Sequence, residues 1–203
     1  MEPAYKLLTV EEFLDCCPND QRHYQLIDGV IVAMAPPAIP HQIIAGNLTG
    51  EIYAAVRANR PGCTTRSQAG IAPQGRLGRN HFETDITVTC EKGGHRGIAA
   101  EPLLIVEIQS PSTERDDVFV KLPEYQSIRS LQEILYIESE RVAVGKAPAS
   151  PTPKKNRMVT MEAAFQAVVV RAVKRLHQET MRVKARRGPI LSPSQAPGTC
   201  SSV

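Results

Sequence analysis

Residues 103–109 read LLIVEIQ, an apolar, β-rich run that contains a single acid, Glu107. A run of this length and composition is typical of a central strand that is buried on both faces of a sheet. Helices must then cover both faces, so this stretch decides the fold class. It also raises a functional question, because a carboxylate in a buried strand is costly unless it is paired or binds a cation.

The segments around this strand predict alternating helices and strands. Thr9 and Glu12 form a capping-box pattern at the start of a helix over about 9–16. Asp28-Gly29 lies inside YQLIDGVIVAM (24–34) and predicts a two-stranded hairpin. Hydrophobic periodicity and turn residues give the rest: helices over 41–59 and 114–129, and strands over 63–72, 82–90, 103–109, 133–139 and 141–144. The order α, ββ, α, β, β, β, α, ββ predicts an α/β fold with a mixed sheet.

The chain of 203 residues divides into two parts of opposite charge. Residues 1–145 hold 13 Lys+Arg and 19 Asp+Glu, a net charge of −6, whereas residues 146–203 hold 11 and 2, a net charge of +9. The second part begins with the proline-rich KAPASPTPKK, continues through 158–187 as one predicted basic helix, and ends in a composition typical of disorder. We therefore expect a domain over 1–145 and an appendage over 146–203. The appendage is either a DNA-binding arm or unrelated, frame-shifted sequence, and we favour the second interpretation.

The N-terminus lacks a cationic region followed by a long apolar run, and no apolar stretch approaches the roughly 20 residues that span a bilayer. We expect a cytoplasmic protein with no membrane segment. The five cysteines form no CxxC pair, so we expect them to be reduced thiols rather than disulfides or a zinc site.

Asp85 and Glu107 lie in predicted strands, where burying a carboxylate costs free energy. Asp85 lies in the strand pattern FETDITVT, and strand alternation places Glu107 and Gln109 on one face. If the two strands are neighbours, two carboxylates and an amide converge, an arrangement that suits Mg²⁺. The alternative is that Glu107 forms a buried ion pair with Lys121 or an arginine, and the spacing alone leaves both open.

Asp117, Lys121 and Tyr125 recur at helical spacing and share one face. Lys121 could hold a scissile phosphate or position the attacking water. The alternative is an Asp117–Lys121 surface pair.

Other candidates are weaker. His81, Glu83 and Asp85 alternate along one strand and could bind a transition metal, but a solvated polar face is favoured because ligands on one strand are too spread. His41 is expected to be a helix-capping group or a neighbour of the site. The chain has no GxxxxGK[ST], GxSxG, HExxH or GxGxxG motif, which argues against P-loop, α/β-hydrolase, zincin and Rossmann proteins.

Residues 5–144 resemble a known family over their whole length. The segments YQLIDGVIVAMAPP, RSQAGIAP, GRNHFETDITVTC, LLIVEIQSPST and LPEYQSIRSLQEILYIES occur in an order similar to that of the Uma-type restriction endonucleases, within the PD-(D/E)XK nuclease superfamily. The resemblance implies a restriction-endonuclease-like mixed sheet flanked by helices. It also implies hydrolysis of DNA phosphodiester bonds with Mg²⁺, for which Mn²⁺ could substitute.

The resemblance assigns roles to particular residues. Asp85 and Glu107 take the places of the two motif acids, which are metal ligands. Gln109 stands where the superfamily pattern has lysine, and Lys121 on the following helix is the substitute for that lysine. Ser110 and Tyr125 match family positions of less certain role.

Some residues depart from the family pattern: Gln25 and Val30 replace glutamates, and Thr84 replaces a proline. These changes leave open a second hypothesis, a catalytically inactive module on the same fold that binds nucleic acid or protein. Nucleases of this superfamily often act as homodimers, so a homodimer is an open expectation. The acidic domain is a poor surface for DNA, but a basic rim is expected from Arg66, Arg76, Arg79 and Arg96.

Overall fold

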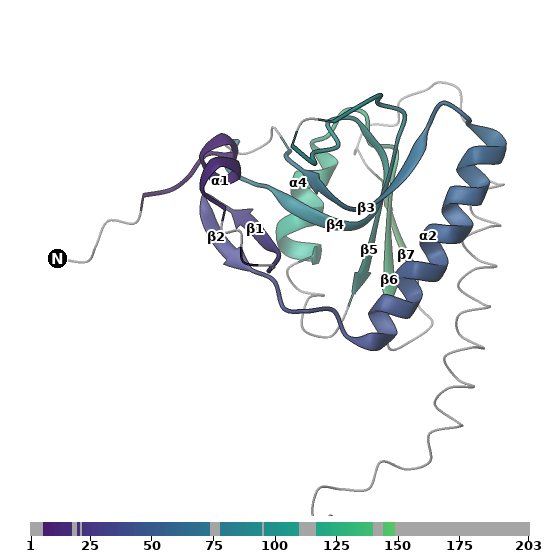
Figure 1. Cartoon of the computed structure of the whole chain (residues 1–203), viewed down its shortest axis with the longest axis horizontal. Helices are drawn as coiled ribbons and strands as arrows, with labels where there is room; N and C mark the ends of the chain where they lie inside the picture. The colour runs from purple at the N-terminus through teal and green to yellow at the C-terminus, as the bar shows by residue number, and fades with distance from the viewer. Residues whose placement is uncertain are drawn as a thin grey trace, which may run out of the picture.

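The computed structural model describes residues 6–17, 20, 22–73, 78–94, 96–109, 117–139 and 144–148. A five-stranded sheet lies between helix α2 on one face and helix α4 on the other, and a small hairpin layer with helix α1 stands beside it (Figure 1). The predicted order of elements is confirmed. The predicted α/β class with a mixed sheet is confirmed as well, because three of the four strand pairs are antiparallel while β5 and β6 pair in parallel.

The hairpin layer forms as its local sequence predicts. Helix α1 (Val10–Cys16) begins with the complete capping box of Thr9 and Glu12. Strands β1 (Tyr24–Ile27) and β2 (Val30–Ala33) pair antiparallel. The turn between them has a positive φ at both Asp28 and Gly29, 49° and 85°, which is the type I′ geometry that Asp-Gly favours.

The main sheet has the strand order β3-β4-β5-β6-β7. Its members are β3 (Thr64–Ile71), β4 (Phe82–Thr89), β5 (Pro102–Gln109), β6 (Glu133–Glu138) and β7 (Val144–Pro148). The strand predicted from LLIVEIQ is β5, which occupies the centre of the sheet and is buried along most of its length. It is therefore the strand that positions Glu107 inside the fold.

Each face of the sheet has its own core. Helix α2 (Ile39–Asn59) lays Ile44, Leu48, Ile52 and Val56 on the face formed by residues such as Ile86 and Val106. On the opposite face, Tyr125 of α4 packs edge to face against Phe82, together with Ile105 and Ile134. Alternate residues of β5 thus enter different cores, and Glu107 belongs to the α4 side.

Two predicted elements differ from the structure. The helix expected over 114–129 is two short pieces, a π-helical turn η1 (Asp117–Lys121) and α4 (Leu122–Gln126), and residues 110–116 lie outside the described part. Pro123 has no N–H to donate to the preceding turn, which accounts for the change of helix type there. The last strand, expected over 141–144, is β7, so residues 146–148 belong to the sheet rather than to a linker. The domain boundary at 145 and the appendage stay predictions.

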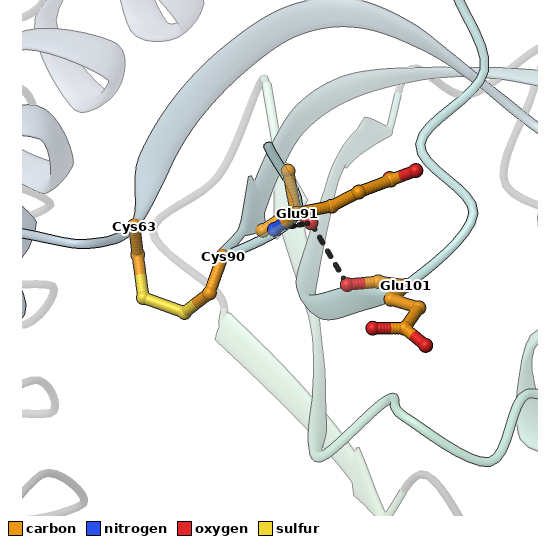
Figure 2. The surroundings of a disulfide bond; sticks show 5 residues. Cys63, Cys90, Glu91 and Glu101 are labelled. Carbon is orange, nitrogen blue, oxygen red and sulfur yellow. Dashed lines mark hydrogen bonds between the residues drawn. A yellow bond between two sulfur atoms is a disulfide. The ribbon is translucent and has the colours of Figure 1, made fainter. Parts of the chain in front are cut away.

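The cysteines provide a correction. Cys63 and Cys90, expected to be reduced, form a disulfide at the end of the β3–β4 pair (Figure 2). They meet because the antiparallel register pairs Thr64 with Thr89, which brings the two flanking residues opposite each other. Their separation of 27 residues follows no sequence motif, so the pairing could be seen only once the strands were placed. Cys16 and Cys17 are free thiols.

No helix within the described ranges is both long enough and apolar enough to cross a bilayer.

Candidate functional site

Asp85 lies where the sheet is locally irregular. The register pairs Ser67 with Ile86 and Ala69 with Thr84 but leaves out Gln68 and Asp85, and Gln68 has a positive φ of 53°. A left-handed residue of this kind is typical of a strand irregularity that re-aims a side chain, a feature often found beside functional sites. Here it coincides with the acid that the sequence singled out.

The Asp85 carboxylate is held from two sides. Its Oδ2 accepts a hydrogen bond of 2.7 Å from the backbone N–H of Ile108, on the neighbouring strand β5. Its Oδ1 lies 3.0 Å from Nε2 of His41, in the first turn of α2. The bond to Ile108 places Asp85 beside Glu107, and β4 pairs with β5, so the condition that their strands be neighbours is met.

Glu107 is the centre of a buried polar cluster. The residue is 3% exposed, and its Oε1 accepts a hydrogen bond of 2.6 Å from the hydroxyl of Tyr125. The Nζ of Lys121 lies 3.4 Å from the same oxygen, and Lys121 and Tyr125 are themselves buried. The cation and the hydroxyl satisfy a carboxylate that burial would otherwise penalise. The contact between Lys121 and Glu107 agrees with the alternative of a buried ion pair. It agrees equally with the role that the resemblance assigns to Lys121, which is to replace the lysine of the superfamily pattern at the candidate site.

His41 was expected to be either a helix cap or a neighbour of the site, and the structure supports the second alternative. It is not the cap, because the N-cap of α2 is Ala38, which makes no side-chain hydrogen bond. The imidazole instead contacts Asp85, from which it is 44 positions distant. Only the packing of α2 against the sheet brings them together.

Two buried amides lie within the regions that the resemblance singled out. Gln109 follows Glu107 on the same face of β5, and its Nε2 has no hydrogen-bond partner among the described residues. Gln25 in β1 is 7% exposed, and in the described structure its Oε1 likewise lacks a partner. Unsatisfied buried amides cost energy, and they are retained where a ligand, water or neighbouring segment completes the bonding.

The strand histidine is not part of the cluster. His81 Nδ1 is buried, and its ring packs beside Phe13 with 5.1 Å between the centroids. Burial lowers the pKa of His81 from its ordinary value of 6.5. Glu83 pairs with His23 at 2.8 Å, so His81, Glu83 and Asp85 have separate surroundings. In the ranges that the structure describes, no three His, Cys, Asp or Glu side chains gather as a metal site.

Two of the four arginines expected to form a basic rim, Arg66 and Arg96, contact neighbouring parts of the fold. Arg96 pairs with Asp15 at 2.7 Å and donates to the carbonyl of Leu14, and Arg66 donates to the carbonyl of Gly93. Arg76 lies outside the described residues. Arg96 thus joins the loop between β4 and β5 to helix α1, and Arg66 of β3 joins the same loop to the sheet.

The donor set suits a hard divalent cation. Asp85 and Glu107 offer carboxylate oxygens from neighbouring strands, and each oxygen has two lone pairs, so a hydrogen bond does not exhaust it. Mg²⁺ is commonly bound through one or two carboxylates, with water and phosphate oxygens completing its shell. The residues present therefore fit Mg²⁺ better than a transition metal, which would favour histidine or cysteine ligands.

Comparison with known proteins identifies similar chains. Residues 10–173 match the model of the Uma2 family, described as "Putative restriction endonuclease". The match continues past residue 144, where the resemblance was expected to end. A crystal structure described as "a putative nuclease belonging to DUF820" from Anabaena variabilis has a similar fold, with a TM-score of 0.53 and 18% sequence identity. The similarity covers 79% of this chain and 99% of that one. No curated protein matches the chain.

Proposed function

Since the chain belongs to the Uma2 family of restriction-endonuclease-like proteins, which supports a nuclease role, we propose that it is a Mg²⁺-dependent endonuclease that hydrolyses DNA. The observation that carries this proposal is the buried Glu107 beside Asp85 on adjacent strands, with Lys121 at 3.4 Å. Buried acids that lie beside a cation and a second acid are candidates for a functional site. We assign the activity to residues 1–145, the predicted nuclease domain.

Each residue has a distinct role in this proposal. Asp85 and Glu107 hold the metal, and Gln109 orients water or phosphate from the same face of β5. A bound Mg²⁺ would lower the pKa of the attacking water and neutralise negative charge on the phosphate. Mn²⁺ is expected to replace it, because carboxylate and water ligands suit both ions.

Lys121 and Tyr125 act on the same carboxylate. Two donors on Glu107 Oε1 fix the orientation of that side chain, and the fixed carboxylate then presents a defined geometry to the metal. Lys121 also brings a positive charge that stabilises the negative charge growing on the phosphate during hydrolysis.

The test compares three isosteric variants in a plasmid-nicking assay with Mg²⁺. Asp85→Asn and Glu107→Gln keep the size and remove the charge, and each is expected to lower the rate by at least about 100-fold. Glu83→Gln is the matched control, because Glu83 lies on the same strand but pairs with His23. Its cleavage rate is expected to equal that of the wild type.

Other outcomes decide against the proposal. Cleavage that persists in Glu107→Gln would show that the site is wrongly assigned. If the wild type binds DNA but cuts no plasmid, junction or single strand with Mg²⁺ or Mn²⁺, the inactive binding module is the better description. If the wild type binds a partner protein but no DNA, it is better described as an inactive module that binds protein.

A further inference from the structure

His41 contacts Asp85 without taking part in the proposed hydrolysis. Its Nε2 lies 3.0 Å from Oδ1 of Asp85, and the two side chains are only 18% and 21% exposed. An ionised carboxylate has no proton to donate, so the contact is favourable only when the imidazole nitrogen carries one. The contact therefore has a direction, in which the histidine holds the carboxylate.

The main chain of His41 is fixed by the packing of α2. His41 is the third residue of the helix, directly after Pro40, whose restricted φ favours the first helical turn. Ile44, one turn further along the same face, and Leu48 are buried against the sheet (Figure 1). The imidazole is thus presented to β4 from a rigid element rather than from a loop, which favours a precise contact.

Asp85 depends on side-chain contacts because regular strand pairing is interrupted at its position. The register of β3 and β4 leaves out Asp85 together with Gln68, which has a positive φ of 53°. Oδ2 of Asp85 accepts the hydrogen bond from the Ile108 amide, and Oδ1 lies against His41. In the part of the chain that the structure describes, each carboxylate oxygen thus has one polar contact. The two contacts come from different elements and together fix the rotation of the carboxylate about its bond to Cβ.

We propose that His41 is a positioning residue, which holds Oδ1 of Asp85 so that the carboxylate meets a divalent cation in one orientation. The inference rests on the proposed function, in which Asp85 and Glu107 hold that cation. His41 does not itself touch the cation. Each carboxylate oxygen has two lone pairs, so the contact with His41 leaves one of them available. Contacts of this kind behind a metal ligand commonly contribute about 10- to 100-fold to metal affinity.

Two other roles of His41 would have different signatures. As a direct metal ligand, its imidazole would favour Ni²⁺ or Zn²⁺ over Mn²⁺, which prefers oxygen ligands. As a packing residue alone, it would contribute to the stability of the fold without affecting metal binding. The three roles are therefore separable by variants that remove or keep the N–H group facing Asp85.

The experiment is isothermal titration calorimetry of the full chain with Mn²⁺, in the absence of DNA. His41→Leu removes the nitrogen and keeps a similar volume, and it is expected to weaken Mn²⁺ binding by about 10-fold or more. His41→Ala repeats the removal without adding an apolar side chain and is expected to behave alike. His41→Gln keeps an N–H group near the position of Nε2, and it is expected to restore most of the affinity.

The matched control is His23→Leu. His23 pairs with Glu83, on the same strand as Asp85, at 2.8 Å, so it is a second histidine–carboxylate pair outside the site. Its replacement is expected to leave the Mn²⁺ affinity equal to that of the wild type. A loss in this variant as large as in His41→Leu would overturn the proposal, because the effect would then not be specific to His41.

Two further results would overturn the proposal while leaving the metal site in place. Equal Mn²⁺ affinities of His41→Leu and the wild type would show that His41 does not position Asp85, and a lower urea midpoint of that variant would assign His41 to packing. A loss that His41→Gln does not recover would show that the N–H group is not what matters. If that loss is larger for Ni²⁺ than for Mn²⁺, His41 is a direct ligand.

Failure of the proposed function has a separate result. If the wild type binds no Mn²⁺, or if Asp85→Asn binds it as tightly as the wild type does, then Asp85 holds no cation and the inference falls with the proposed function. If Asp85→Asn loses Mn²⁺ binding and His41→Leu does not, the metal site stands and the inference about His41 alone is wrong.

Discussion

Replacing Tyr125 with phenylalanine tests the buried cluster without creating a cavity. Tyr125 is fully buried, and its hydroxyl donates a hydrogen bond of 2.6 Å to Glu107 Oε1. Phenylalanine keeps the ring and its edge-to-face contact with Phe82, so the hydroxyl is the only group lost. A hydrogen bond to a charged group contributes about 1.5–3 kcal/mol, and we expect Tyr125→Phe to lower the free energy of unfolding by that amount.

The assay is urea denaturation followed by far-ultraviolet circular dichroism at neutral pH. The midpoint should fall while the m-value stays constant, because the surface exposed on unfolding does not change. Tyr53→Phe is the control: Tyr53 is 48% exposed, and its loss should change stability by less than about 0.5 kcal/mol.

The result that refutes the reasoning is equal stability of Tyr125→Phe and the wild type. It would mean that the tyrosine hydroxyl does not stabilise the carboxylate and that Glu107 is satisfied in another way. Because the measurement needs neither metal nor DNA, it tests the geometry separately from the proposed activity.

Three further predictions concern parts of the fold away from Glu107. Reducing the Cys63–Cys90 disulfide should lower the free energy of unfolding by about 3.5 kcal/mol, from the chain entropy of its 27-residue separation, and denaturation with and without a phosphine reductant measures this. Burial lowers the pKa of His81, so the unfolded chain takes up a proton first as the pH falls below 6.5. Stability should therefore decrease from pH 7 to 5, and less steeply in His81→Gln; equal slopes would contradict this. Thr9→Ala removes the cap of α1 and should cost about 1 kcal/mol, seen as a lower melting temperature.

Local sequence signals predicted the elements because each depends on neighbouring residues. The capping box of Thr9 and the Asp28-Gly29 turn formed as expected, and LLIVEIQ proved to be the central strand. The adjacency of Asp85 and Glu107 was predictable only as a condition on strand pairing, which the structure meets.

Features set by distant pairing could not be predicted. The disulfide of Cys63 and Cys90 depends on the register of β3 against β4, and the contact of His41 with Asp85 depends on how α2 lies on the sheet. The left-handed Gln68 has no signal in the sequence, because glutamine rarely adopts that conformation. The division of the predicted helix into η1 and α4 also depends on packing in the folded chain, although Pro123 is a sequence signal for a change of helix type there.

The hydrogen bond from Ile108 to Asp85 has a consequence for how this chain can change over time. Here a side-chain oxygen accepts the hydrogen bond that a main-chain carbonyl would otherwise accept, so Asp85 takes part in the hydrogen bonding of the sheet. A chain that discards the acid for a small apolar residue leaves a strand amide without an acceptor, whereas asparagine or glutamate retains one. The proposed metal-binding role and the structural role of Asp85 therefore coincide at one position, so a variant that loses the proposed activity but keeps an oxygen there should retain the strand contact.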